Sequence, residues 1–294
     1  MRKLRGIAAL VALALAAFAI AACGSSNDTK GGDGGGAGTH ATTAQRAAGV
    51  PATIKVGAAI GFPPFEYYDT DGKTVIGFEP DIFDEVFKRI GTKPEWVNAK
   101  FETLFPGIES DRYDVLVNGI FDTPERQARF DFVDYLRDES GILVNQGNPK
   151  GITSAKTLCG TTIVVLRGTT HEKYVRDASA KCKAARKPAV NVLALADHSS
   201  GLLQMKAGRV DGIAAQFEQI HYWLRQSPEL YAAAPFSYER QTLGAVFDKG
   251  NDQLVQATRN ALQEMVADGT YAQRLAKWGL EDLALDEATV NLGR

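Results

Sequence analysis

The chain has 294 residues, a formal net charge of −2 at pH 7 and 45% hydrophobic residues. This is an ordinary globular composition, sufficient for one large domain or two modest ones. Beyond the first five residues there is no basic tract, so the charge pattern argues against a nucleic-acid-binding protein.

The N-terminus has the pattern of a secretory signal peptide. Arg2, Lys3 and Arg5 precede an apolar run from Ile7 to Ala22. This run is shorter than the roughly 20 residues that a membrane-spanning helix needs. We therefore predict a signal peptide over residues 1–22 rather than a permanent anchor.

The end of this segment carries a more specific pattern. Residues 20–25, IAACGS, resemble the lipobox of bacterial lipoproteins, in which the cysteine, here Cys23, carries the lipid. The alternative is an ordinary small-residue cleavage site beside a chance cysteine. A Gly-, Ser-, Thr- and Ala-rich stretch follows and is typical of a flexible tether. We predict a lipidated cysteine and a tether over residues 23–50.

The folded part begins near Pro51 and alternates strands with helices. The sequence predicts a strand over 54–59, an aromatic Gly/Pro loop over 61–66 and an amphipathic helix over 80–90. Further short elements are predicted around Trp96, Leu104 to Ile108 and Val115 to Val117. This alternation predicts an α/β unit with a mainly parallel sheet.

The next helix start places an arginine in an unusual position. Thr123 and Pro124 are typical of an N-cap and a first helical position. Arg126 then lies in the first turn, where the helix dipole disfavours a cation by roughly 0.3–1 kcal/mol. A bound anion would explain this placement. The alternatives are a solvated arginine or one paired with Glu125 or Asp122.

A second α/β unit follows residues 147–149. A β-rich run over 162–166 leads through Gly168 to Thr169 and Glu172, which have the spacing of a capping box. Exposed N–H groups at such a helix start form an anion site, although most strand–helix turns bind nothing.

The remaining elements continue the alternation. They are predicted as strands over 191–195, 210–215 and 241–247, a helix over 199–207, and two terminal helices around Leu262 and Leu275.

Two cysteines, Cys159 and Cys182, remain after the predicted lipid site. They lie 23 residues apart in a chain predicted to be exported, so we predict a disulfide, with two free buried thiols as the alternative. No CxxC pair occurs, which argues against zinc or thioredoxin-like chemistry.

These residues together resemble the bacterial extracellular solute-binding proteins of family 3, which serve polar amino acid ABC transporters. No single motif is specific, but the order of the motifs through the whole folded body is. The motifs are Pro63-Pro64-Phe65-Glu66, Gly77-Phe78 with Asp81, Leu104 with Pro106, Asp114-Val115 with Gly119, Thr123-Pro124-Glu125-Arg126, Gly168-Thr169-Thr170, Gly208-Arg209-Val210-Asp211, Lys249-Gly250-Asn251, and Asp268-Gly269-Thr270-Tyr271 with Lys277-Trp278.

The resemblance implies a two-lobed, type II periplasmic-binding-protein-like fold with two hinge strands. Each lobe would be a mainly parallel sheet flanked by helices. Lobe 1 would comprise residues 51–144 plus 243–294, and lobe 2 residues 145–242. The ligand would be held between the lobes, which close on it by a hinge motion.

The resemblance also implies the ligand contacts. Arg126 matches the arginine that pairs with the ligand α-carboxylate, and Thr170, beside Thr169, matches the grip from the opposite lobe. Gly119 matches a main-chain contact, and Phe62 and Phe101 match two positions that pack on the ligand side chain. His171, just after Thr170, could reach that side chain or could be a solvated first-turn residue.

Two positions depart from the family pattern. Phe121 stands where a Thr or Ser is usual, and Gln216 stands where an Asp usually holds the α-ammonium. An uncompensated ammonium in a closed cleft is costly. Glu66, Asp122 or Glu218 would have to supply the missing negative charge. The predicted contacts with the carboxylate are therefore retained, whereas the contact with the ligand ammonium is in question.

The sequence therefore predicts a monomeric, lipid-anchored, extracytoplasmic binding protein without a cofactor or metal. It would carry a small carboxylated solute, chiefly an amino acid, to an ABC permease. Two alternatives are a dehydratase of the same fold and a ligand-sensing subunit of a signalling partner. We found no GxSxG, HExxH or P-loop pattern.

Overall fold

The computed structural model describes residues 49–293, which all belong to one compact unit. The predicted signal peptide, Cys23 and all but the last two residues of the predicted tether lie outside the described residues. None of the described helices combines the length and apolar character that crossing a membrane requires.

The first group of elements follows the predicted alternation closely. Its helices and strands are β1 (Thr53–Ala58), β2 (Tyr67–Tyr68), β3 (Val75–Ile76), α1 (Phe78–Arg89), β4 (Lys93–Asn98), α2 (Leu104–Glu109), β5 (Val115–Leu116) and α3 (Pro124–Gln127). Helix α1 is amphipathic and buries Ile82, Phe83, Val86 and Phe87, as its spacing predicts. Helix α3 is only one turn long, shorter than the predicted helix start suggests.

The remaining elements begin with a strand of 16 residues. The resemblance implied a hinge strand near Leu143 and Val144, at the end of this strand, but its greater part was not predicted. They are β6 (Phe130–Asn145), β7 (Thr162–Leu166), α4 (Thr170–Ala184), β8 (Asn191–Leu195), α5 (His198–Lys206), β9 (Gly212–Gln216), α6 (Phe217–Gln226), β10 (Tyr231–Ala233), β11 (Tyr238–Asp248), α7 (Asp252–Ala267), α8 (Thr270–Trp278) and β12 (Thr289–Val290). Short 3₁₀ turns cover Phe101–Thr103, Ala155–Leu158 and Glu281–Leu283.

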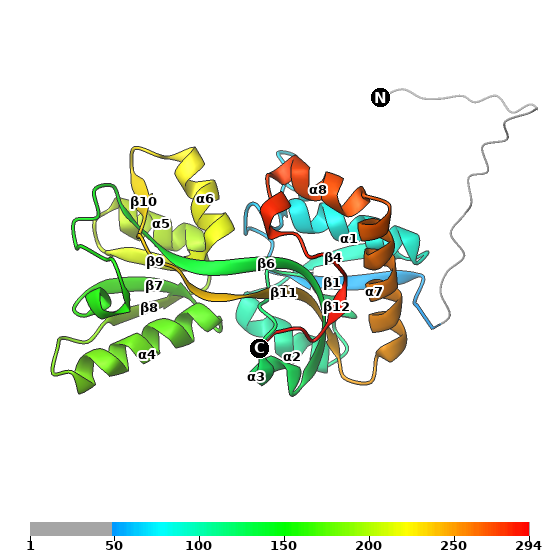
Figure 1. Cartoon of the computed structure of the whole chain (residues 1–294), viewed down its shortest axis with the longest axis horizontal. Coiled ribbons are helices and arrows are strands. Elements are labelled where there is room, and N and C mark those ends of the chain that lie inside the picture. The colour runs from blue at the N-terminus through cyan, green and yellow to red at the C-terminus, as the bar shows by residue number, and fades with distance from the viewer. Residues whose placement is uncertain (1–48, 294) are drawn as a thin grey trace, which may run out of the picture. The chain divides into compact units, whose positions relative to one another are not determined.

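One continuous sheet runs through the described residues in the order β4-β1-β5-β11-β6-β9-β7-β8, and β10 and β12 also pair with β6. The pairs at its two ends, β1 with β4 and β5, and β7 with β8 and β9, are parallel. The central strands β6 and β11 are antiparallel to each other and extend along the middle of the fold (Figure 1). The sheet is therefore parallel at its ends, as predicted, and antiparallel at its centre.

The buried side chains form separate cores on the two sides of these central strands. One large cluster gathers around β1, α1 and α7, with a smaller cluster around α2 and β5. Two further clusters lie around β7 with α4 and around β9 with α6. This division supports our proposal that residues 51–144 plus 243–294 form one lobe and residues 145–242 the other. Leu166, at the end of β7, packs on the α2 cluster and so connects the two sides.

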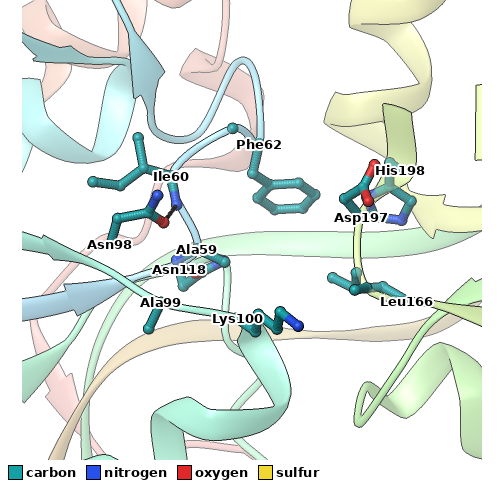
Figure 2. A pocket seen from close by; sticks show the side chains of 12 residues that line it. Ala59, Ile60, Phe62, Asn98, Ala99, Lys100, Asn118, Leu166, Asp197 and His198 are labelled. Carbon is teal, nitrogen blue, oxygen red and sulfur yellow. Dashed lines mark hydrogen bonds between the residues drawn. The ribbon is translucent and has the colours of Figure 1, made fainter. Parts of the chain in front are cut away.

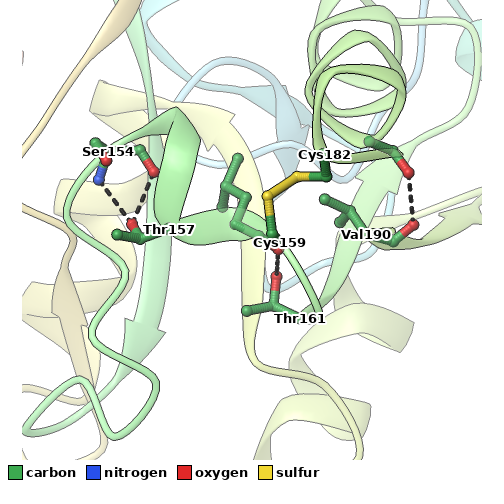
Figure 3. The surroundings of a disulfide bond; sticks show 8 residues. Ser154, Thr157, Cys159, Thr161, Cys182 and Val190 are labelled. Atoms are coloured by element: carbon green, nitrogen blue, oxygen red, sulfur yellow. Dashed lines mark hydrogen bonds between the residues drawn. A yellow bond between two sulfur atoms is a disulfide. The ribbon is translucent and has the colours of Figure 1, made fainter. Parts of the chain in front are cut away.

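A disulfide joins Cys159, after the 3₁₀ turn of residues 155–158, to Cys182 in α4 (Figure 3). Cys182 is buried among the residues around β7, and Cys159 packs against them. Nearby, Ser179 Oγ donates a hydrogen bond to the main-chain oxygen of Val190 (3.0 Å), which ties α4 to the segment before β8. The disulfide thus lies at the cluster of buried side chains around β7 and α4.

Candidate functional site

Almost all the predicted ligand contacts line one small cavity of about 20 Å³. It adjoins a wider cavity of about 360 Å³, and the two share Phe62, Asn118, Leu166 and His198 (Figure 2). The predicted residues around the small cavity are Phe62, Phe101, Gly119, Phe121, Arg126, Thr169, Thr170, His171 and Gln216. The structure therefore brings together residues from the loops before β2 and after β5, the 3₁₀ turn at residues 101–103, α3, the N-terminus of α4 and the end of β9.

Arg126 is held by its own loop. Thr123 is the N-cap, and its Oγ1 accepts a hydrogen bond from the Arg126 N–H (3.3 Å), as predicted. The guanidinium donates to the main-chain oxygen of Phe121 (2.8 Å) and lies 5.0 Å from the centre of the Phe105 ring. Because α3 is a single turn, its dipole is weak and disfavours a cation less than the sequence suggested. The helix dipole is therefore weaker support for a bound anion than predicted.

The electrostatics of Arg126 favour an anion for a different reason. Burial lowers the pKa of Arg126 to about 10, and the nearest acidic groups, led by Glu239, offset this only in part. The side chain stays charged at neutral pH, yet none of the ion pairs among residues 49–293 includes it. The alternative pairing with Glu125 or Asp122 is therefore not found. A half-buried cation without an ion-pair partner is stabilised by any anion that enters the cavity.

The opposite wall is the N-terminus of α4. The Thr169 side chain caps it by accepting from the Glu172 N–H (3.3 Å), as the capping-box spacing predicts. The return bond differs, because the Glu172 carboxylate accepts from the Gly168 N–H (2.8 Å). The helix has 15 residues, and its first N–H groups, at Thr170 and His171, have no intrahelical acceptors. This helix end is the second favourable place for negative charge.

Two buried histidines complete the wall. His171 was a candidate from the sequence, whereas His198 was missed. Burial is the main cause that lowers the pKa of His171 to about 3 and that of His198 to about 4. Both rings are therefore neutral, and within the described residues His171 Nδ1 and His198 Nε2 have no hydrogen-bond partner. The small cavity is thus lined by one cation and otherwise by neutral groups.

The low pKa of His198 predicts a pH effect on stability. A histidine that is neutral when folded and titrates near 6.5 when unfolded destabilises the fold as the pH falls below 6.5. When the pH falls from 7 to 5, the unmodified protein should therefore lose about 2 kcal/mol more unfolding free energy than His198→Phe. Denaturant unfolding of both proteins at the two pH values measures this. Equal losses in the two proteins would contradict it.

Gly119 and Gln216 form a direct link across the cavity. The Gly119 N–H donates to Glu79 Oε1 (2.6 Å), and the Gly119 oxygen accepts from Gln216 Nε2 (2.7 Å). Gly119 has a φ of 55°, and a Cβ there would lie 2.9 Å from Gln216 Nε2. Since the amide nitrogen faces Gly119, the Gln216 Oε1 is left as an acceptor, and no described residue donates a hydrogen bond to it.

Phe62 and Phe101 each pack against other aromatic rings. Phe62 stacks on Phe65 (ring centres 4.5 Å apart) and on His198 (5.7 Å), so it faces the histidine across the wider cavity (Figure 2). Phe101 contacts Phe105 edge-on (6.3 Å), and Phe121 contacts His171 edge-on (6.0 Å). Phe121, in place of the expected hydroxyl, is therefore packed against the neutral imidazole.

The three candidate acids do not line the cavity. Glu66 is fully buried beside Glu79, and burial followed by the charge of Glu79 raises the pKa of Glu66 well above its usual value. The Asp122 carboxylate accepts from Gln127 Nε2 (2.8 Å) and the Gly293 N–H (2.7 Å). Glu218, whose pKa is raised by burial, lines neither cavity.

Residues beyond the predicted contacts complete the lining. Asn118 and Leu166 line both cavities, and Lys100 and Asp197 line the wider one (Figure 2). Asp197 is also the N-cap of α5, where it accepts from the Ser200 N–H (2.7 Å). Among the described residues, no group of three or more His, Cys, Asp or Glu is arranged to hold a metal ion.

Comparison with known proteins identifies the family. The sequence profile of the bacterial extracellular solute-binding proteins, family 3, matches residues 54–281. Arginine-binding protein ArgT of Corynebacterium glutamicum is 30% identical over 81% of this chain and 78% of its own length. L-cystine-binding protein TcyJ of Escherichia coli K12 is 27% identical over 77% of this chain and 82% of its own.

A solved structure shows the same likeness. An ancestral arginine-binding protein bound to arginine is 29% identical, with a TM-score of 0.71 over 78% of this chain and 98% of that chain. These matches confirm the family and the two-lobed α/β fold that the sequence predicted. The chain belongs to the bacterial extracellular solute-binding proteins, family 3.

Proposed function

We propose that this protein captures an amino acid and delivers it to an ABC importer. The observation that carries the proposal is the placement of Arg126 opposite the N-terminus of α4, around one cavity. The relatives named for arginine and cystine support the ligand class.

In this proposal the α-carboxylate binds between the two positive groups. Arg126 donates its free guanidinium N–H groups from one side, while the N–H groups of Thr170 and His171 donate from the other. Charge-assisted hydrogen bonds of this kind are about twice as strong as neutral ones, and removal of water strengthens them further. Because the two groups come from different lobes, one carboxylate stabilises the closed arrangement.

The α-ammonium is held by neutral acceptors. Gln216 presents its Oε1 because its Nε2 is bonded to Gly119. None of the residues that line the small cavity is an acid. The amino group therefore contributes less to binding here than it would opposite a carboxylate.

The ligand side chain extends into the wider cavity. Phe62 and His198 provide flat walls, and the charged residues Asp197 and Lys100 also line this cavity. An amino acid with a long polar side chain fits this arrangement, because the apolar stem packs on the rings while its end reaches the charged groups.

The setting of the protein is part of the proposal. The signal-peptide pattern and the lipobox around Cys23 support export and lipid anchoring to the cell membrane, beside a permease. We propose a monomeric carrier without catalytic activity. The candidate acids that a dehydratase would need, Glu66, Asp122 and Glu218, do not line either cavity.

Replacing Gln216 tests the amine grip. Relative to the unmodified protein, Gln216→Asp should favour L-arginine or L-cystine over its deaminated analogue about tenfold, since a carboxylate binds an ammonium more strongly than a neutral amide does. The lost hydrogen bond to the Gly119 oxygen affects both ligands alike. The deaminated analogue of the same ligand is the control, because it lacks the ammonium and should bind the variant no better. Isothermal titration calorimetry measures both. Equal gains for both ligands would show that Gln216 does not contact the amino group.

A further inference from the structure

A segment beyond the family match closes against the loop that carries Arg126. Residues 284–293, here called the C-terminal strap, follow the end of the matched region at residue 281. Within the strap, β12 pairs antiparallel with β6, Thr289 opposite Asp134 and Val290 opposite Val133. Asn291 extends this pairing, because its N–H donates to the Phe132 oxygen (3.1 Å) and its Oδ1 accepts from the Phe132 N–H (2.8 Å).

The end of the strap bonds to buried carboxylates. Leu292 N–H donates to Asp134 Oδ2 (3.0 Å), and Thr289 Oγ1 donates to the same oxygen (3.1 Å). Gly293 N–H donates to Asp122 Oδ2 (2.7 Å). Asp122 and Asp134 are both buried, so without the strap each carboxyl group would lose hydrogen-bond donors that a buried polar group needs.

The Gln127 side chain, in the loop that carries Arg126, forms hydrogen bonds with the strap and with Asp122. Gln127, the residue after Arg126, donates from its Nε2 to Asp122 Oδ1 (2.8 Å) and to the Gly293 oxygen (2.9 Å). The Asp122 N–H donates to the Thr242 oxygen of β11 (2.9 Å). Asp122 thus joins the strap through its side chain and a central strand through its main chain.

The contact is too close for a side chain on Gly293. A Cβ at this position would lie 2.0 Å from the main-chain oxygen of Asp122 and 2.7 Å from its Cγ. The end of the strap is therefore fitted to this loop, and a single methyl group would push the two apart.

We infer that the C-terminal strap is a positioning element for Arg126. The guanidinium donates to the oxygen of Phe121, the residue directly before Asp122. The strap fixes Asp122 and thereby the main chain on which the direction of the guanidinium depends. Its role in binding rests on the proposed function, whereas its role in ordering the loop does not.

The test replaces the glycine and reads the loop and the ligand separately. In Gly293→Ala, the amides of Asp122, Arg126 and Gln127 should exchange hydrogen about tenfold faster, because the loop opens more often. Calorimetry with L-arginine, well below the melting temperature, should show affinity about tenfold lower. Gln127→Ala removes two hydrogen bonds without adding bulk, so it should also speed amide exchange and lower the affinity. It replaces Gly293→Ala as the test if that variant does not fold.

The control is Glu287→Ala, which changes an exposed strap residue that has no hydrogen bond or ion pair among residues 49–293. It should leave both measurements unchanged. Unchanged exchange in Gly293→Ala and Gln127→Ala would overturn the inference, as would faster exchange with unchanged affinity. If the unmodified protein binds neither L-arginine nor L-cystine, the proposed ligand class is wrong, and the exchange rates alone still decide whether the strap orders the loop.

Discussion

Replacing Arg126 by alanine should strongly weaken ligand binding without weakening the unliganded fold. Loss of one partner of a desolvated, hydrogen-bonded charge pair costs about 2–5 kcal/mol of binding, which is roughly a 30-fold to several-thousand-fold loss of affinity. The free protein should keep its melting temperature, because burial already lowers the pKa of Arg126 and the charge has no ion-pair partner to lose among the described residues.

A thermal-shift assay separates these two effects. A ligand at 100 times its dissociation constant adds about 2.7 kcal/mol of stability to the unmodified protein, and Arg126→Ala should lose most of this gain. Arg129→Ala is the matched control. Arg129 follows three residues later, is exposed, pairs with Glu109 and lines neither cavity. A stabilisation that is undiminished in Arg126→Ala would show that the carboxylate binds elsewhere.

Removal of the disulfide should give the largest change in stability. The double substitution Cys159→Ala and Cys182→Ala frees a loop with a sequence separation of 23. In the loop-entropy account this lowers the free energy of unfolding by about 3 kcal/mol. For a unit of this size that corresponds to roughly 6–12 °C in melting temperature.

Ligand affinity should not change with the disulfide, because neither cysteine lines the ligand cavities. Chemical denaturation with and without reductant measures the effect. The double variant should be insensitive to reductant, while the unmodified protein should lose stability when reduced. If the variant is as stable as the oxidised protein, the crosslink does not constrain the unfolded chain.

Local signals made much of the site predictable. The caps at Thr123 and Thr169 depend on residues three positions away, so their geometry can be inferred from sequence, and the structure contains both. The motif order then indicated which helix starts belong to one site. The shared cavity of Arg126 and Thr170 agrees with that interpretation.

The parts that were missed depend on contacts distant in the chain. His198 is a lone histidine in sequence, and its stacking partner Phe62 lies in another part of the fold. Strand β6 contains Asp131, Asp134 and Asp138, which obscure its strand pattern. Asp134 is accommodated there because Thr242 and Thr289 donate to it, and no local pattern indicates those bonds.

Glu66 was misjudged for a related reason. It follows an aromatic loop that contributes Phe62 to the cavity, so it was a reasonable acid for the ligand amine. The chain folds its side chain inward instead, beside Glu79, which holds the Gly119 N–H and accepts a hydrogen bond from Tyr135. The turn between Phe62 and Glu66 thus separates a cavity residue from a core residue.

The most direct test is a crystal structure with a bound amino acid that stabilises the protein in a thermal-shift screen. We expect the α-carboxylate within hydrogen-bond distance of the Arg126 guanidinium and of the N–H groups at Thr170 and His171, with the side chain in the wider cavity that Phe62 and His198 line. A ligand whose carboxylate lies away from Arg126, or one bound outside these two cavities, would contradict the proposed site.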